Sequence, residues 1–227
     1  MAKSETARRE SEPRREQVLR VAETLFARAG YRGVGLREIA AEVGIRAPSL
    51  FKHFAGKQAL YNAVLANIFA RLEEVAACLT GGAPFAARLQ RFIGGYVDLV
   101  ADDPAVVPLL FRTLMERSEA LEAETRRAGA NIYRRIDVFL AEGQRAGAFR
   151  PVDRFRFQIA LTGAILYHGL AARSYQAVLL EHVAPPDRAA WKRTVLDLAR
   201  SALLVHSDDA DHDAPVPPRV TRKATSR

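Results

Sequence analysis

Apolar residues recur at helical spacing along almost the whole length of this 227-residue chain. A typical series is Leu89, Phe92, Tyr96 and Val100, in which the apolar positions return every three or four residues. No window shows the sustained period-two alternation that indicates a half-buried strand. The spacing, with its breakers, therefore predicts an all-α fold of about nine helices.

Glycine and proline clusters divide the chain into segments. The first three predicted helices are short and closely connected, over roughly residues 14–30, 36–43 and 47–54, and a fourth over 57–79 links them to longer, more apolar helices. We expect four regions, namely a disordered arm over 1–13, a three-helix domain over 14–56, a larger helical domain over 57–206 and a disordered tail over 207–227. The tail is poor in large apolar residues and cannot offset the entropy of ordering.

The charge of the chain is strongly positive. The formal net charge is +8, and the first 60 residues hold twelve Lys or Arg against seven Asp or Glu. A basic excess at the short helices suits a polyanionic partner such as nucleic acid, although basic ends are often only solvated.

Neither a membrane nor a secretory pathway is indicated. The opening "MAKSETARRESEPRRE" has no apolar run behind it, and no stretch approaches the roughly 18 apolar residues of a membrane span. The single cysteine, Cys78, cannot form an internal disulfide. We therefore expect a cytoplasmic protein.

Residues 36–54 have the pattern of a helix-turn-helix. Ile39, Ala40 and Val43 lie on one side of a short helix, Gly44 follows where the chain must turn with a positive φ, and Leu50 begins the inner side of the next helix. The second helix keeps its outer face free for another partner.

The residue types on that outer face suit a DNA groove. Pro48 is tolerated in a first helical turn, and the small Ala47 permits close approach. Ser49 and Lys52 can bond phosphates or base edges, and Lys57 begins the fourth helix, where free N–H groups favour a phosphate. The alternative is a compact helical corner whose Lys and His side chains are only solvated.

Residues 30–65 also resemble the DNA-binding domain of the TetR family of transcriptional repressors. The resemblance rests on Gly30-Tyr31, on the Arg-Glu-Ile-Ala of residues 37–40, and on the Phe51 to Phe54 segment followed by Lys57 and Leu60. It implies that Phe51, His53 and Lys57 meet phosphates and that four residues face base edges, namely Arg46, Ala47, Ser49 and Lys52. The expected DNA-contacting set is Gly35, Arg37, Arg46, Ala47, Pro48, Ser49, Phe51, Lys52, His53 and Lys57.

Two positions depart from the family pattern. Gly35 stands where the family usually has a Thr or Ser that caps the second helix and touches the DNA backbone, and it brings no hydroxyl. Phe51 stands where a tyrosine is common, so a hydroxyl hydrogen bond is lost there. Each departure removes a hydroxyl that would bond the DNA backbone, while Phe51 can still stack against the sugar-phosphate.

The larger domain holds enough aromatic and Met side chains to line a cavity, or equally to fill one. The resemblance implies a small-molecule effector pocket among its helices. The candidate pocket residues are Phe69, Phe92, Tyr96, Phe111, Arg112, Met115, Tyr133, Tyr167 and His168. The alternative for His168 is a packing role in the core or an interface.

The last two predicted helices, over about 153–181 and 187–205, carry more apolar area than one small core needs, which suggests a homodimer. The candidate interface residues are Leu166, Leu170, Val178, Trp191, Val195, Leu198 and Leu203. The resemblance implies a four-helix bundle between two copies and a repressor that an effector releases from a palindromic operator.

Other functions find little support in the sequence. It contains no Gly-rich phosphate loop, no Gly-x-Ser-x-Gly, no His-Glu-x-x-His and no cysteine cluster, so we expect neither an enzyme nor a cofactor. The tail "HSDDADHD", residues 206–213, could bind a metal but is better explained as a solvated acidic segment. A DNA-binding dimer with a filled core and no effector remains the closer alternative.

Overall fold

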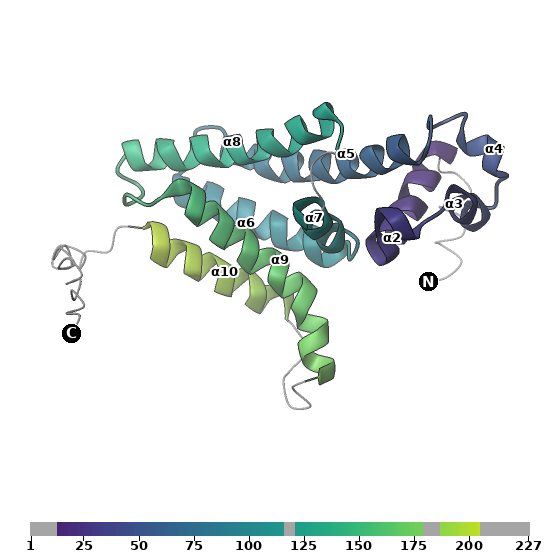
Figure 1. Cartoon of the computed structure of the whole chain (residues 1–227). Helices are drawn as coiled ribbons and strands as arrows, with labels where there is room; N and C mark the ends of the chain where they lie inside the picture. Colours follow the sequence, from purple (N-terminus) through teal and green to yellow (C-terminus); the bar gives the residue numbers. More distant parts are fainter. Residues whose placement is uncertain (1–12, 116–120, 179–186, 205–227) are drawn as a thin grey trace, which may run out of the picture.

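A computed structural model describes residues 13–115, 121–178 and 187–204 of the chain, and these residues form helices throughout (Figure 1). They contain nine α-helices and one short 3₁₀ helix, which agrees with the predicted all-α fold. The elements are α2 (Arg14–Gly33), α3 (Leu36–Val43), α4 (Ala47–Leu50), α5 (Lys57–Ala76), η1 (Ala77–Leu79), α6 (Phe85–Asp102), α7 (Val106–Met115), α8 (Ala123–Arg145), α9 (Arg154–Val178) and α10 (Arg188–Leu203).

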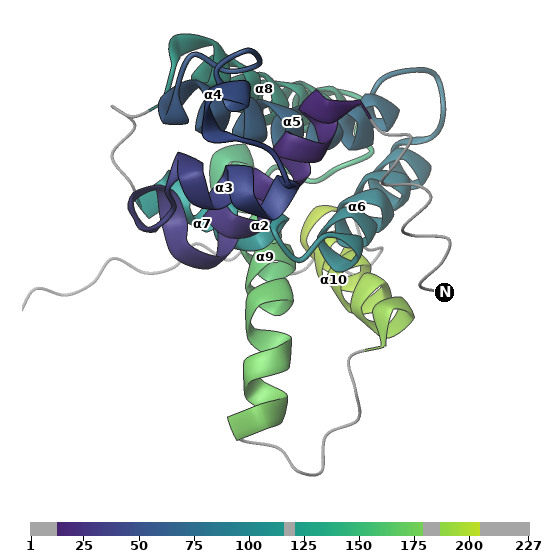
Figure 2. The ribbon, with the colours of Figure 1, turned by 90° about the vertical axis from the view of Figure 1, so that its right-hand side faces the viewer.

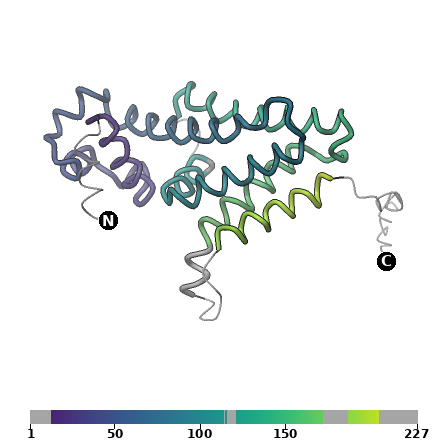
Figure 3. Tube along the Cα trace, turned by 180° about the vertical axis from the view of Figure 1, so that it is seen from behind, coloured from purple at the N-terminus to yellow at the C-terminus, as the bar shows by residue number. Residues whose placement is uncertain are grey.

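The helices form a small group at one end of the molecule and a larger bundle. Helices α2, α3 and α4 lie together at one end, and α5 runs from them along α8 (Figures 1 and 2). Helices α9 and α10 lie side by side along one edge of the bundle, which the view from behind also shows (Figure 3). Helix α5 therefore joins the two parts.

Most predicted helix boundaries agree with the structure, with two local differences. The first helix continues to Gly33, but its helical backbone breaks at Gly30, where φ is 73° and ψ is 174°. The third predicted helix is regular only over Ala47–Leu50 and continues as a turn in which the N–H groups of His53 and Phe54 both donate to the Leu50 carbonyl. The predicted disordered arm, apart from residue 13, and the predicted tail lie outside the described residues.

Aromatic packing fixes α2 on α5. The ring of Phe26 meets that of Tyr61 edge to face at 5.1 Å, and Tyr31 lies 5.1 Å from the same Tyr61 ring. Val18, Ala22 and Phe26 are fully buried along one side of α2. Such pairs add to the free energy of burial, so the orientation of α2 on α5 is well determined.

Within the described residues, no helix has the length and hydropathy needed to cross a membrane.

Candidate nucleic-acid interface and cavity

The turn between α3 and α4 has the geometry of a helix-turn-helix. Gly44 adopts the left-handed conformation, with φ 74° and ψ 32°, which confirms the positive φ predicted there. The N–H of Ile45 donates to the Ala40 carbonyl at 2.9 Å, as at the end of a helix closed by a left-handed residue. Ile39 and Leu50 are buried across the turn, so both helices are held by apolar contacts.

The ten residues predicted to contact DNA lie near one another at this end of the molecule. Arg46, Pro48, Lys52 and His53 are exposed on and after α4, and Phe51 exposes 57% of its surface. Ala47, Ser49 and Lys57 are half-buried, and Gly35 and Arg37 are exposed at the start of α3. Phe51 lies near Arg46 and Lys52 and does not pack into the core of the chain. This surface is therefore open to a partner.

Gly35 begins α3 without a capping hydroxyl. Its N–H donates to Glu38 Oε2 at 3.5 Å, and its carbonyl accepts the N–H of Ile39 at 3.2 Å. The start of α3 is thus stabilised by the Glu38 side chain, because Gly35 has no hydroxyl that could cap the helix.

Lys57 is held in place by an aromatic ring. Its Nζ lies 4.6 Å from the centroid of the Tyr31 ring, and no carboxylate within the described residues pairs with it. A cation fixed by a ring at the first residue of α5 keeps N–H donors for an anion.

A cavity of about 340 Å³ lies between α5, α6, α7, α8 and α9. Four predicted pocket residues line it, namely Phe69, Phe92, Tyr96 and Tyr133, together with Leu166, which was predicted for the dimer interface. The other lining residues were not predicted: Leu72, Leu110, Thr113, Leu121, Thr125, Arg126, Gly129, Ala130, Ile132, Ile136 and Thr162. The signal for four of them was the stripe of Thr125, Gly129, Ile132 and Ile136 at helical spacing on α8.

The other five predicted pocket residues do not line this cavity. Phe111 is half-buried in α7, while Met115 exposes 82% and Tyr167 55% of their surfaces. Arg112 packs against the break in α2, where its Nη2 donates to the Arg28 carbonyl at 3.5 Å.

His168 lies at a separate place in the bundle. Its ring stacks on that of Trp191 at 4.3 Å, and both residues line a second cavity of about 400 Å³ between α6, α7, α9 and α10. Burial lowers the pKa of the His168 imidazole, which favours its neutral form.

The chain matches known regulators in sequence and in fold. Residues 18–64 match the family model for bacterial regulatory proteins of the tetR family. The chain therefore carries a TetR-family DNA-binding domain. The family model describes bacterial regulatory proteins, so this chain is a helix-turn-helix DNA-binding regulator.

Solved structures share the fold at low identity. A putative fatty acid metabolism regulator from Clostridium perfringens superposes with a TM-score of 0.71 at 16% identity, over 84% of this chain and 100% of that one. The ketosteroid transcriptional regulator KstR2 of Mycobacterium tuberculosis gives 0.66 at 19%, over 86% and 97%. AibR in complex with isovaleryl coenzyme A and operator DNA gives 0.65 at 19%, over 82% and 97%.

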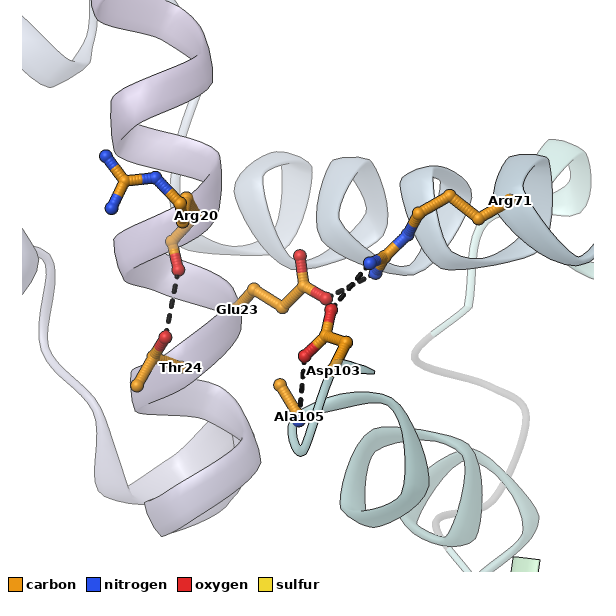
Figure 4. Close-up of polar contacts among 6 residues, drawn as sticks. All are labelled: Arg20, Glu23, Thr24, Arg71, Asp103 and Ala105. Atoms are coloured by element: carbon orange, nitrogen blue, oxygen red, sulfur yellow. Dashed lines mark hydrogen bonds and ion pairs between the residues drawn. The ribbon is translucent and has the colours of Figure 1, made fainter. Parts of the chain in front are cut away.

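A cluster of three charged residues joins the TetR-family DNA-binding helices to the bundle (Figure 4). The Arg71 guanidinium on α5 lies 2.5 Å from Glu23 of α2 and 2.5 Å from Asp103 of the α6–α7 turn. Asp103 also accepts the N–H of Ala105 at 2.9 Å, just before α7 begins. The cluster therefore fixes α2, α5 and the start of α7 to one another.

The two carboxylates of this cluster have different acidities. Burial raises the pKa of Glu23 to about 7, although the Arg71 charge acts in the opposite direction. Burial also acts to raise the pKa of Asp103, but hydrogen bonds from Arg71 and the Ala105 N–H outweigh it and lower that pKa. Asp103 is thus the constant anionic partner of Arg71, and Glu23 is the partner that titrates near neutral pH.

A second polar contact fixes the start of α8 on α5. The buried Asn62 accepts the N–H of Glu122 at 3.0 Å through Oδ1, while its Nδ2 donates to the Gln58 carbonyl at 3.0 Å. The first turns of α8 carry Thr125 and Gly129 of the cavity wall. One helix, α5, thus supports both the cavity wall and the candidate DNA surface.

The residues predicted for the dimer interface are placed in two ways. Trp191, Val195 and Leu203 are buried within the chain, whereas Leu170 and Leu198 are exposed. The side chain of Val178 lies outside the described residues. Helix α9 also exposes Phe155 and Ile159, which sequence reasoning missed, and Tyr167, which it assigned to the effector pocket.

Proposed function

We propose that this TetR-family regulator is a homodimeric repressor that a small apolar or amphipathic effector releases from a palindromic operator. The observation that carries the proposal is that α5 begins with Lys57 in the DNA-binding part and also supplies Phe69 and Leu72 to the wall of an apolar cavity. A cavity of this size favours an effector over a filled core that senses nothing. AibR, which shares the fold, was solved with both isovaleryl coenzyme A and operator DNA.

The proposed DNA contacts come from one continuous surface. Arg46, Ala47, Ser49 and Lys52 face base edges in this proposal, because they lie on α4, just before it or in the turn that follows it. Phe51, His53 and Lys57 contact phosphates on either side of the groove, and Pro48, Gly35 and Arg37 complete the surface. Residues 14–56 would form the DNA-binding domain and 57–206 the effector-binding and dimerisation domain.

The proposed dimer uses the outer faces of α9 and α10. Phe155, Ile159, Tyr167 and Leu170 follow one another at helical spacing on α9, and Leu198 is exposed on α10. A two-fold interface of this kind presents the same stripe from both copies, with Gly163 in its middle allowing close approach. Such a dimer would place two α4 helices in successive major grooves about 34–36 Å apart.

The operator DNA is released if the effector binds more tightly to an arrangement of α5 and α7 that differs from the DNA-binding one. The cavity touches α5 through Phe69 and α7 through Leu110, and the Arg71 cluster connects both helices to α2. A ligand that moves α7 would change the position of α2 and therefore the spacing of the two α4 helices. The effector must bind the DNA-incompetent arrangement more tightly, since equal affinity for both shifts nothing.

Selection of bound duplexes from a random DNA library by the full-length protein tests this proposal. We expect an enriched palindrome whose half-site centres are one helical turn apart, about 10 base pairs. Enrichment of a single half-site would contradict the dimeric assembly, and no enriched sequence would contradict specific recognition. Lys52→Ala should change the enriched bases, whereas Lys57→Ala should weaken binding to all sequences alike.

A further inference from the structure

Two tyrosines, the buried Tyr96 and the 42%-exposed Tyr133, line the cavity between α5 and α9. Tyr96 of α6 is 6% exposed and lines the cavity, and within the described residues its hydroxyl has no hydrogen-bond partner. The Tyr96 hydroxyl oxygen is not one of the fully buried polar atoms that lack a hydrogen-bond partner. It is therefore accessible from the cavity that Tyr96 lines. Tyr133 of α8 lines the same cavity and interacts electrostatically with Tyr96.

Both hydroxyls are protonated at neutral pH. Burial raises the pKa of Tyr96, and the nearby Tyr133 raises it further. Burial also raises the pKa of Tyr133. Each tyrosine therefore offers an O–H donor to a ligand and carries no charge of its own.

The rest of the wall decides which ligand oxygen suits these donors. Most lining residues are apolar, and Thr125, which is almost fully buried, adds a third hydroxyl without a partner among the described residues. The cation that lines the cavity, Arg126, is exposed at the start of α8, where its Nη1 donates to the Leu121 carbonyl at 2.6 Å. On α8, Arg126 precedes Tyr133 by seven residues, which is about two turns or roughly 10 Å, so a carboxylate bonded to the tyrosine hydroxyls would be buried among apolar groups away from this cation.

An uncharged carbonyl oxygen avoids this cost. It has two lone pairs, so it can accept one hydrogen bond from Tyr96 and one from Tyr133. Phe69, Phe92 and Ile136 would then pack against the apolar remainder of the ligand. We propose that the effector of this regulator is an uncharged ketone or ester with an apolar body, whose carbonyl oxygen accepts from Tyr96 and Tyr133.

The main alternative is a fatty acid with its carboxylate at Arg126 and its alkyl chain inside. That arrangement places alkyl groups against the hydroxyls of Tyr96 and Thr125 and leaves both unsatisfied. A buried polar group without a partner is costly, so the cavity disfavours this arrangement.

Gly129 limits the width of the ligand. A Cβ at this position would lie 3.3 Å from the Phe69 ring, so α8 approaches α5 closely here. A slender alkyl body therefore suits this part of the cavity better than a branched one.

Isothermal calorimetry with the full-length protein tests the head-group assignment, which rests on the proposed effector function. The probes are methyl n-alkyl ketones of graded chain length, with methyl heptyl ketone compared directly with nonanoate. We expect the ketone to bind more tightly than the acid. Tyr96→Phe and Tyr133→Phe should each weaken ketone binding about three- to tenfold, because each removes one hydrogen bond.

Two control variants separate this effect from a general loss of structure. Arg134→Gln removes an exposed cation of α8 outside the cavity, and Arg126→Gln removes the cation at its edge; both should leave ketone affinity unchanged. Tighter binding of nonanoate that depends on Arg126 would overturn the proposal. Unchanged ketone affinity in both tyrosine variants, or no binding by any ketone of the series, would also overturn it.

Release of DNA, measured in parallel, distinguishes this inference from the proposed function. A ketone that binds through Tyr96 without releasing DNA would contradict effector control but support the head-group assignment. An acid that binds and releases DNA would support effector control and overturn the head group.

Discussion

The Arg71 guanidinium on α5 lies 2.5 Å from the Glu23 carboxylate on α2. Because Arg71 also bonds Asp103 of the α6–α7 turn, the same side chain connects the DNA-binding helices to an element of the cavity wall. Three residues that are far apart in the chain thus form one contact at the junction of the two parts (Figure 4).

Arg71→Met should destabilise the fold by about 2 kcal/mol. The variant leaves Asp103 without its cation, but the cost stays below that of a fully buried ion pair because Glu23 can take up a proton and Asp103 is partly exposed. Denaturant unfolding at neutral pH measures the change. Arg28→Met removes the exposed pair with Glu38 and should cost no more than about 1 kcal/mol. Equal costs for the two variants would contradict a structural role for the cluster.

Glu23→Gln should change the pH dependence of stability. The folded chain holds the Glu23 proton up to about pH 7, whereas the unfolded chain releases it near 4.5. Between these values the folded state binds more protons, so the Glu23 contribution to stability falls as the pH rises. The free energy of unfolding of the wild type, relative to the variant, should therefore decrease by about 3 kcal/mol over this window. Unfolding curves across the window that stay parallel, or a difference of opposite sign, would exclude the raised pKa.

Gly30→Ala should be more destabilising than Gly44→Ala. Both glycines have positive φ, but Gly30, with ψ 174°, lies in a region that only glycine adopts readily, whereas Gly44, with ψ 32°, lies in the left-handed helical region. A Cβ at Gly30 would also displace the end of the Arg112 side chain, whose Nη1 would lie 2.6 Å away. Thermal unfolding should show a cost of about 1 kcal/mol for Gly44→Ala and about 2–3 kcal/mol for Gly30→Ala.

Combining Gly30→Ala with Arg112→Ala should recover part of that cost. The clash is then absent, but the backbone at ψ 174° still belongs to a region that only glycine adopts readily. Strictly additive costs of the two substitutions would show that the Arg112 contact is not the cause.

Ile159→Glu should convert the protein to a monomer if α9 forms the dimer interface. The residue is exposed in the single chain, so the substitution should leave the fold intact while placing a charge in the proposed two-fold interface. Sedimentation analysis measures the state, and Val138→Glu, an exposed apolar position on α8, is the matched control. A dimeric Ile159→Glu protein would place the interface elsewhere.

The helix-turn-helix could be predicted from sequence because local chemistry determines it. Gly44 is a strong turn signal, and the alternation of inner and outer residues around it identifies both short helices. The ten expected DNA contacts lie together for the same reason, since they belong to one short continuous segment. Their roles toward DNA stay predictions.

The cavity and the junction depend on long-range packing, which spacing cannot reveal. Arg112 and Met115 lie on a helix with Leu110, but the orientation of α7 turns Arg112 toward α2 and Met115 toward solvent. The Arg71 cluster joins residues 23, 71 and 103, and no local pattern connects them. By contrast, Phe155, Ile159 and Tyr167 are a visible stripe that could have been found by counting from Leu170.

Fluorescence anisotropy with DNA from beside the chain's own gene tests the central claim most directly. The full-length protein and Lys52→Ala are titrated against this duplex and a scrambled one across a salt series. The account predicts that the wild type prefers its own duplex by at least about a thousandfold and that Lys52→Ala reduces this preference. Equal affinity for both duplexes at every salt concentration, or a preference that Lys52→Ala leaves unchanged, would contradict recognition through α4.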